Sequence, residues 1–526
     1  MFRPLALPLR LFRIARILAK YDALAVLEEA RVFPALLKSA RVFSRPFSAR
    51  GLAGQRPGQK LARALTELGP SFIKLGQFAA TRADLVGETV AADLAELQDR
   101  LAPFPGEEAR AIVERELEQP LEALYASFET QPVSAASIAQ VHFAVTHPDP
   151  AQEDSEGREV AVKVLRPGIE AAFERDLELF RWIAGLAERS APKARRLRPR
   201  AVVEVFAESV RIEMDLRMEA AAAAELARNF AGDESYRVPE IDWSRTSRRV
   251  LTTTRLSGIR LDDRAALLAA RHDLTEVLSK AAAIFFNQVF RDGYFHGDQH
   301  PGNMFVTEDG AIGAVDFGIM GRLDRKTRTY LADMLLATLA QDYRRLAQVH
   351  VDAGWLPPGQ HVETFAQALR AVCEPIFGQP LERISFARLL GQLLALTEDF
   401  EMPVQPQLVL MQKNMLMAEG VSRKLEPSLN IWVLAEPLIV AWMRENRGVR
   451  AQTSEALDSL RETAARLPQA LRALEDLSGA VDARGIKLHP DTVAAFRGRR
   501  GAAALLPWLA TGLSILALIL ALIALD

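Results

Sequence analysis

The sequence contains a single cysteine, Cys373, among its 526 residues, and this scarcity excludes an intrachain disulfide. A chain without disulfides is typical of a reducing, cytoplasmic setting, and we interpret Cys373 as a small core residue. An excess of charge of one sign is also missing, because 65 basic and 67 acidic side chains leave a formal net charge of −2. No global basic field therefore favours nucleic acid as a partner, and we expect none.

A long apolar run without charge lies near the C-terminal end, from Ala502 to Leu525. At about 1.5 Å per helical residue, the run is longer than the ~30 Å hydrocarbon core of a membrane. We predict a single transmembrane helix over residues 502–525, with a buried hairpin of two short helices as the alternative. Arginines precede the run directly, so the positive-inside rule places the N-terminal body in the cytoplasm.

The N-terminal segment is basic and amphipathic, which distinguishes it from a cleavable signal sequence. Its basic residues interrupt any apolar core, and no small-residue cleavage site follows. At about 100° per residue, four basic side chains share one helical face, namely Arg10, Arg13, Arg16 and Lys20. Four apolar side chains share the other face, namely Leu11, Phe12, Ile14 and Leu18. This pattern favours a helix lying on an anionic membrane surface, and a helix docked on protein is the alternative.

Hydrophobic periodicity divides the chain into six parts. They are a basic, membrane-proximal helical region at 1–58, a helical extension at 59–130, a small β-rich lobe at 131–258, a helical lobe at 259–450, linker helices at 451–501 and the apolar helix at 502–525. We predict strands at 138–145, 159–165, 238–241 and 249–256, helices at 168–190 and 200–230, and a hairpin at 304–316. The predicted fold class is α+β, with the bilobal plan of protein kinases.

The strongest chemical signal is H-G-D-Q-H-P-G-N at His296–Asn303, followed by D-F-G at Asp316–Gly318. Asp298 and Asn303 are five residues apart, which is the spacing of the Asp and Asn in a kinase catalytic loop. The predicted hairpin returns the chain, so that Asp316 can lie beside Asn303. Oxygen ligands on neighbouring loops, completed by phosphate oxygens, suit Mg²⁺. This compound pattern predicts phosphoryl transfer with ATP and Mg²⁺.

A lysine lies in the middle of the predicted strand at 159–165. Lys163 occurs in V-A-V-K-V, a pattern that resembles the V-A-I-K strand of kinases. A lysine flanked by apolar residues needs a counter-charge, and Glu219 is the best candidate. The glycine-rich phosphate loop of kinases is missing. Ser134, Ala135, Ala136 and Ser137 occupy its place, where backbone N–H groups can contact phosphate less freely than in a glycine loop.

Three further motifs complete the pattern: K-x-G-Q at Lys74–Gln77, an alanine-rich loop within Val133–His142, and E-x-D at Glu213–Asp215. Gly76 inside an otherwise good helix costs about 1 kcal/mol relative to Ala, which indicates a close backbone approach. With these motifs the chain resembles the UbiB/AarF family of atypical kinases, the bacterial relatives of mitochondrial ADCK/Coq proteins. The resemblance covers most of residues 60–450.

The resemblance implies a role for each matching residue. Lys163 and Glu219 would form the phosphate-contacting pair, Asp298 would be the catalytic-loop aspartate, and Asn303 and Asp316 would hold Mg²⁺. The helix with Lys74 and Gln77 would cover the active site and take part in catalysis. The alanine-rich loop, Glu213 and Asp215 would line the nucleotide site. An Ala at position 222 and the hinge strand, which lacks an acidic residue near position 254, depart from the family pattern.

The resemblance also implies a function. We expect an atypical kinase or ATPase in the cell inner membrane that supports ubiquinone biosynthesis. Its expected partners are membrane lipids, prenylated phenol or quinone intermediates and other proteins of that pathway. Bacterial relatives often have two C-terminal membrane helices, so one span departs from that pattern. A small-molecule kinase of the aminoglycoside or choline type, and a nucleotide-sensing lipid-binding scaffold with little turnover, are the alternatives.

Overall fold

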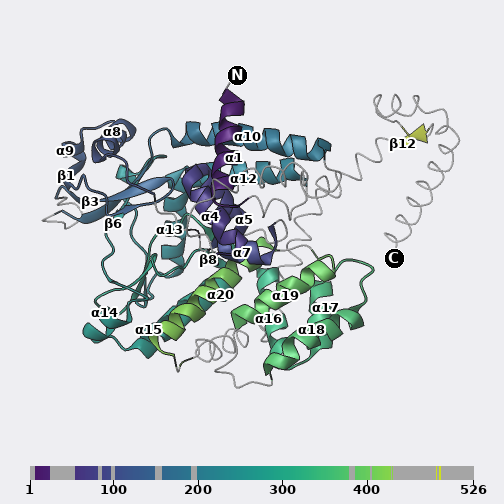
Figure 1. Ribbon diagram of the computed structural model, residues 1–526. Coiled ribbons are helices and arrows are strands. Elements are labelled where there is room, and N and C mark those ends of the chain that lie inside the picture. Colours follow the sequence, from purple (N-terminus) through teal and green to yellow (C-terminus); the bar gives the residue numbers. More distant parts are fainter. Residues whose placement is uncertain are drawn as a thin grey trace. The chain divides into compact units, whose positions relative to one another are not determined.

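The computed structural model describes residues 6–23, 54–80, 86–95, 97, 101–148, 157–190, 198–377, 386–402, 405–427, 429, 481–482 and 485–486. Figure 1 shows these residues as coloured ribbon. The predicted membrane helix at 502–525 and most of the predicted linker at 451–501 lie outside the described residues. Among the described helices, none is both long and apolar enough to cross a membrane.

The small lobe is built on an antiparallel sheet of five strands. They are β1 (Tyr125–Phe128), β2 (Ser134–Ala135), β3 (Ala139–Thr146), β4 (Glu159–Leu165) and β6 (Val250–Thr254). The order is β1-β3-β4-β6, with β2 paired to β3. The strands predicted at 138–145, 159–165 and 249–256 are confirmed. The prediction that β structure starts only after residue 130 is wrong, because β1 starts at Tyr125; four residues are too few to show a period of two.

Alternation along β4 decides which side chains face which layer. Val160, Val162 and Val164 are buried against α8 (Gly106–Leu117) and α9 (Leu121–Leu124) on one face of the sheet. Lys163 therefore points to the other face, where α10 (Ile169–Ser190), α12 (Pro199–Glu213) and α13 (Leu216–Asn229) lie. One face of the sheet is thus covered by apolar packing, and Lys163 lies on the opposite face.

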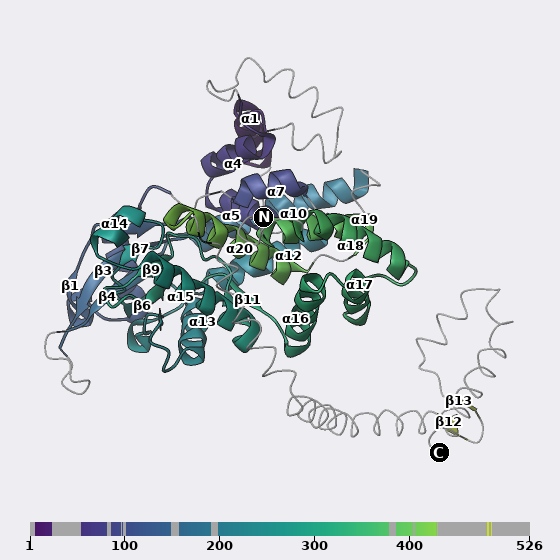
Figure 2. The same ribbon diagram turned by 90° about the horizontal axis from the view of Figure 1, so that it is seen from below.

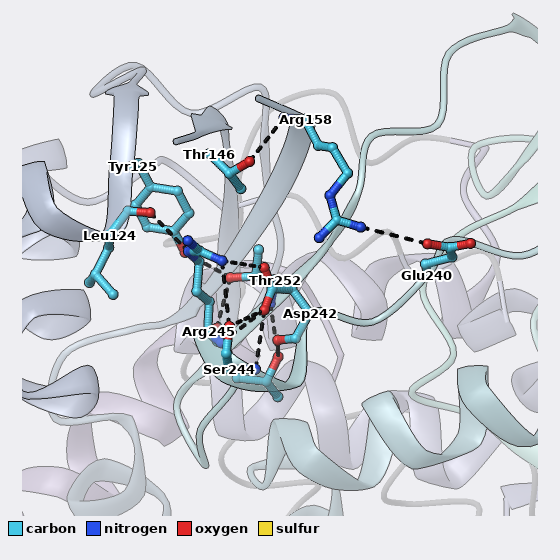
Figure 3. Close-up of polar contacts among 10 residues, drawn as sticks. Leu124, Tyr125, Thr146, Arg158, Glu240, Asp242, Ser244, Arg245 and Thr252 are labelled. Carbon is cyan, nitrogen blue, oxygen red and sulfur yellow. Dashed lines mark hydrogen bonds and ion pairs between the residues drawn. The ribbon is translucent and has the colours of Figure 1, made fainter. Parts of the chain in front are cut away.

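The loop before β6 is fixed to the sheet by a polar network (Figure 3). Asp242 accepts hydrogen bonds from the backbone N–H groups at the start of the 3₁₀ turn η3 (Trp243–Arg245) and pairs with Arg245 at 2.7 Å. Arg245 also donates to the carbonyl oxygen of Leu124 at 2.8 Å. The hydroxyl of Thr252 donates to the carbonyl oxygen of Arg245 and lies 2.8 Å from the Tyr125 hydroxyl. Of the strand predicted at 238–241, the structure shows only an isolated bridge from Ile241 to Thr253, beside a backbone hydrogen bond from Thr254 to Glu240.

The N-terminal extension packs on the helices of the small lobe. It contains α1 (Ala6–Lys20), α4 (Pro57–Leu68), α5 (Pro70–Ala80) and α7 (Glu88–Ala95). α1 contacts α4, and Ile17 is buried there beside Ala64. Arg10 pairs with Asp176 of α10, so part of the basic face also contacts protein. Phe12 is 68% exposed. The helix is therefore docked on protein along one side, and membrane contact by its open side stays a prediction.

The larger lobe combines short strands with helices. A four-stranded sheet has the order β5-β10-β9-β7, from β5 (Tyr236–Arg237), β7 (Ile259–Arg260), β9 (Met304–Val306) and β10 (Ile312–Ala314). The predicted hairpin at 304–316 is confirmed as β9 and β10. β8 (Tyr294–His296) pairs with β11 (Met320–Arg322). The prediction that only 304–316 interrupts this helical lobe is therefore wrong, because three-residue strands leave no periodic trace.

The remaining elements of the larger lobe are helical (Figure 2). They are α14 (Arg264–Ala269), α15 (Leu274–Phe286), the π-helical turn η4 (Asn287–Asp292), α16 (Arg325–Leu339), α17 (Tyr343–Asp352), α18 (Val362–Phe377), α19 (Phe386–Asp399) and α20 (Pro406–Leu425). α16 to α20 contact one another in chain order. Cys373 is fully buried in their core, as expected for a packing residue. A second unit, residues 443–526, contributes β12 (Val481–Asp482) and β13 (Gly485–Ile486) to the described residues.

Candidate active site

Lys163 lies between two carboxylates from distant parts of the chain. Its Nζ is 2.8 Å from Oε1 and 2.9 Å from Oε2 of Glu219 on α13. The same atom is 3.0 Å from Oδ1 of Asp316, which lies two residues after the end of β10. The side chains of Lys163 and Glu219 are nearly buried, whereas that of Asp316 is 47% exposed. The structure thus brings together the strand lysine, the helix glutamate and the D-F-G aspartate.

The charges of this group set one another's protonation. Burial alone would lower the pKa of Lys163, but the charges of Asp316 and Glu219 outweigh burial and raise it. The charge of Lys163 holds the pKa of Asp316 well below its usual range, and Lys74 adds to this effect. Burial raises the pKa of Glu219 against the opposing influence of Lys163. At neutral pH Asp316 is therefore an anion, as a ligand of a hard cation must be.

The loop with Asp298 is held by hydrogen bonds to its backbone. The N–H of Asp298 donates to Nδ1 of His296 at 3.0 Å, and Nε2 of His296 lies 3.2 Å from the carbonyl oxygen of Val315. Burial lowers the pKa of His296, so its ring is neutral and can accept at Nδ1 while it donates at Nε2. His296 thereby ties the Asp298 loop to the strand that leads to Asp316.

Asn303 and Asp316 are brought together by the hairpin. The N–H of Val315 donates to the carbonyl oxygen of Asn303 at 2.9 Å, next to Asp316 in the chain. Nδ2 of Asn303 donates to the carbonyl oxygen of Asp298 at 3.2 Å, which leaves the side-chain oxygen as the acceptor. Asp316 has a left-handed backbone (φ 64°), a conformation that Asp tolerates better than most residues. An amide oxygen and an ionised carboxylate fit Mg²⁺, which takes a few protein oxygens and completes its shell with phosphate and water.

The alanine-rich loop forms the turn between β2 and β3. The N–H of Ala136 donates to the carbonyl oxygen of Ala139 at 2.8 Å, so this group is used inside the turn. Ser137 is fully buried. Arg166, just after β4, donates two hydrogen bonds to the carbonyl oxygen of Ala136, at 3.0 and 2.8 Å. The loop is therefore tethered to the lysine strand, and nucleotide contacts by Ser134, Ala135, Ala136 and Ser137 stay a prediction.

α5, the helix that contains the K-x-G-Q motif, brings Lys74 close to this group of charged side chains. Lys74 is buried and forms an ion pair with Glu213 at the end of α12. Glu213 in turn adds to the influences that raise the pKa of Glu219. The side-chain oxygen of Gln77 is buried, and no described residue donates a hydrogen bond to it. Lys74 thus acts on the group of charges around Lys163, and the catalytic roles of Lys74 and Gln77 stay predictions.

Asp215 has a different environment from Glu213. It is the N-cap of α13, where its carboxylate accepts from the N–H of Arg217 at 3.2 Å and pairs with the Arg217 guanidinium at 2.6 Å. The described contacts of Asp215 are thus structural, since they fix the start of the helix that holds Glu219. A nucleotide contact by Asp215 stays a prediction.

The sequence did not point to Arg166, Lys413 or Asn414, which also form the site. Lys413 and Asn414 lie on α20, where Nζ of Lys413 is 2.8 Å from Oδ1 of Asp298. Arg166 follows a strand whose pattern drew attention only to Lys163. These residues stand far in sequence from the motifs they contact, so spacing carried no signal for them.

The small sheet, the helix glutamate and the two aspartate loops define the chain as a protein-kinase-like protein of an atypical class. Residues 96–350 match the family described as "ABC1 atypical kinase-like domain", and residues 369–430 match "UbiB helical domain". The chain belongs to the UbiB family of atypical kinase-like proteins.

Curated relatives support this assignment over most of the chain. "Probable protein kinase UbiB" of Xanthomonas oryzae pv. oryzae is 42% identical over 89% of this chain and 83% of the relative. The protein of the same description from Marinobacter nauticus is 43% identical over 84% of this chain and 79% of the relative. A solved structure from Mycobacterium tuberculosis, described as the complex of Rv3197 with erythromycin, is 25% identical over 71% of this chain and 95% of that one, with a TM-score of 0.46.

Proposed function

We propose that this protein is an ATP-dependent phosphotransferase or ATPase that binds Mg-ATP at the site formed by Lys163 and Asp316. The observation that carries the proposal is the position of Lys163, whose Nζ is held by Glu219 and Asp316 at 2.8 and 3.0 Å. Phosphoryl transfer requires a cation at the phosphates beside a carboxylate that holds the metal. Lys163 and Asp316 provide both, on elements of two lobes.

Each residue has a distinct part in this proposal. Lys163 orients the phosphates, and Glu219 holds Lys163 in place. Asn303 and Asp316 hold Mg²⁺, which supplies positive charge to the phosphate oxygens. Asp298 orients the attacking oxygen and accepts its proton. α5 covers the site with Lys74, an arrangement that favours a small or lipid acceptor, or water, over a peptide.

The proposed setting of this activity is the inner membrane, in support of ubiquinone biosynthesis. The names of the relatives, "Probable protein kinase UbiB", support the pathway. The apolar sequence at 502–525 and the open side of α1 around Phe12 support attachment to a membrane. We propose prenylated phenol or quinone intermediates as the molecules that the protein acts on or presents.

Calorimetric titration of the full-length protein with Mg-ATP tests the nucleotide site. Wild type should bind Mg-ATP, and Asp316→Asn should lose the magnesium-dependent part of that binding. Asp309→Asn is the matched control, because Asp309 lies in the turn between β9 and β10 and pairs with Arg237 at the surface. Folded wild-type protein that binds no Mg-ATP would refute the proposal. Quinone profiles of a deletion strain complemented by Asp298→Asn test the pathway.

A scaffold that binds nucleotide with little turnover is a second candidate. The observation that favours it is the buried Lys74–Glu213 pair, which couples α5 to the charges around Lys163. This candidate requires Mg-ATP binding with negligible phosphate release, even when membranes and a prenylated phenol are added. Steady phosphate release that Asp298→Asn abolishes would exclude it.

A further inference from the structure

Lys413 reaches the catalytic loop from α20, in the segment that matches the UbiB helical domain. Its Nζ lies 2.8 Å from Oδ1 of Asp298, and the two side chains are 25% and 21% exposed. The pair is therefore shielded from most solvent, although neither side chain is fully buried. In the described part of the chain, Lys413 is the cation paired with Asp298.

Asn414, the next residue, fixes α20 to the same loop on both sides of Asp298. Its buried Nδ2 donates to the carbonyl oxygen of His296 at 2.6 Å, and its Oδ1 accepts from the N–H of Gln299 at 3.1 Å. Neighbouring side chains on a helix point about 100° apart. Asn414 thus occupies the interface with the loop, and Lys413 extends along its edge to the carboxylate.

The other lysines of the site have their charges balanced elsewhere. Lys163 pairs with Glu219 and Asp316, and Lys74 pairs with Glu213. At the Asp298 end, where the phosphoryl group meets its acceptor, the positive charge comes from Lys413. Charge on the equatorial phosphoryl oxygens grows in the transition state, and a preorganised cation there lowers the barrier.

We propose that Lys413 is a catalytic residue that contacts the transferring phosphoryl group. The inference rests on the proposed function, since it requires Mg-ATP at this site. The bond between the γ-phosphorus and the oxygen of ADP breaks, and a bond between the γ-phosphorus and the acceptor oxygen forms. The proton of the acceptor hydroxyl or water passes to Asp298. Lys413 stays protonated throughout, and its flexible stem lets Nζ move from Asp298 to the phosphoryl oxygens.

The test compares the binding of Mg-ADP alone with that of Mg-ADP and aluminium fluoride, a mimic of the transferring group. Lys413→Met should weaken binding of the fluoride complex about 100-fold and change binding of Mg-ADP less than about twofold. Lys413→Arg should regain part of the loss. Lys424→Met, on the same helix and in an ion pair with Asp262 at 2.9 Å, is the matched control and should behave as wild type.

The outcomes separate this inference from the proposed function. Equal weakening of both ligands by Lys413→Met would give Lys413 a structural role only, and no weakening would give it none. A wild type that binds Mg-ADP but gains no affinity from aluminium fluoride would also overturn the inference, while nucleotide binding stands. A wild type that binds neither ligand would overturn both. Thermal unfolding of each variant shows that the fold is retained.

Discussion

Nζ of Lys163 lies 2.8 Å from Oε1 of Glu219, and this contact joins β4 of the small sheet to α13. Both side chains are nearly buried, so each depends on the other for its charge balance. The same Nζ also lies 3.0 Å from Oδ1 of Asp316. Two ion pairs of one lysine therefore link the sheet, the helix and the loop that contains Asp316.

Lys163→Met should lower both stability and nucleotide affinity. Removal of the cation leaves Glu219 buried without its partner, which costs about 3–5 kcal/mol. Adding Glu219→Leu should restore most of the stability, because two apolar side chains can pack where the ion pair was, but it should not restore affinity. Urea unfolding and titration with Mg-ATP measure the two effects. A double variant that binds Mg-ATP as wild type does would contradict the role of Lys163.

The sequence predicted this part of the site well because its motifs are local. The V-A-V-K-V strand, the Asp298–Asn303 loop and D-F-G each place a side chain within a few residues of a turn or strand end. Glu219 was predicted as the helix carboxylate that Lys163 needs, and the family resemblance pointed to the same residue. The structure then brings them together at hydrogen-bonding distance, as the kinase plan requires.

What the sequence missed depends on tertiary contacts. Lys413 and Asn414 are neighbours on α20, and they contact the neighbouring residues Asp298 and Gln299 across 115 positions of the sequence. Such pairs leave no periodicity in either segment. β8 and β11 were missed for a related reason, because three-residue strands are defined by their partner and not by their own pattern.

Gly76→Ala should destabilise the protein, whereas Gly420→Ala should not. A Cβ atom at Gly76 would lie 2.7 Å from Cδ1 of Leu65 and 2.9 Å from Cδ1 of Leu97, which is the close approach that the K-x-G-Q motif predicted. Overpacking of this kind costs about 1–3 kcal/mol. Nothing lies within 4 Å of a Cβ at Gly420, so alanine there should stabilise α20 by about 0.4–1 kcal/mol.

Urea unfolding at pH 7 measures both glycine variants. Both variants replace a helical glycine with alanine. The difference between their free energies of unfolding therefore isolates the contact of α5 with α4 and α7. Equal effects of the two substitutions would show that Gly76 does not set this contact.

Asp242→Asn should remove stability at pH 7 but not in acid. Burial alone would raise the pKa of Asp242, yet hydrogen bonds from Ser244 and Arg245 lower it overall (Figure 3). Because the folded pKa lies below the unfolded value of about 3.9, the contribution of Asp242 is complete above that value. It disappears as the pH falls through the folded pKa. We expect a loss of about 1–2 kcal/mol at pH 7 from the cap and ion pair.

Urea unfolding of wild type and Asp242→Asn at pH 7 and in acid tests this dependence. The difference between them should shrink below the unfolded pKa. Glu240→Gln is the control, because Glu240 is exposed and lies 3.8 Å from Arg158; its effect should stay within about 0.5 kcal/mol. A constant difference for Asp242→Asn at all pH values would mean that the network does not depend on the charge of Asp242.

Lys74 and Glu213 should be coupled both in stability and in nucleotide binding. Their ion pair joins α5 to α12, and Lys74 also acts on Asp316. A double-mutant cycle of Lys74→Met and Glu213→Gln should give a coupling free energy of about 1–3 kcal/mol in urea unfolding. The same cycle measured by Mg-ATP titration should give a nonzero coupling, because loss of the pair changes the charge near Asp316.

The exposed pair Arg344–Glu363 provides the control cycle, with coupling below about 1 kcal/mol. Additive effects at Lys74 and Glu213 in both measurements would show that their ion pair does not influence the site.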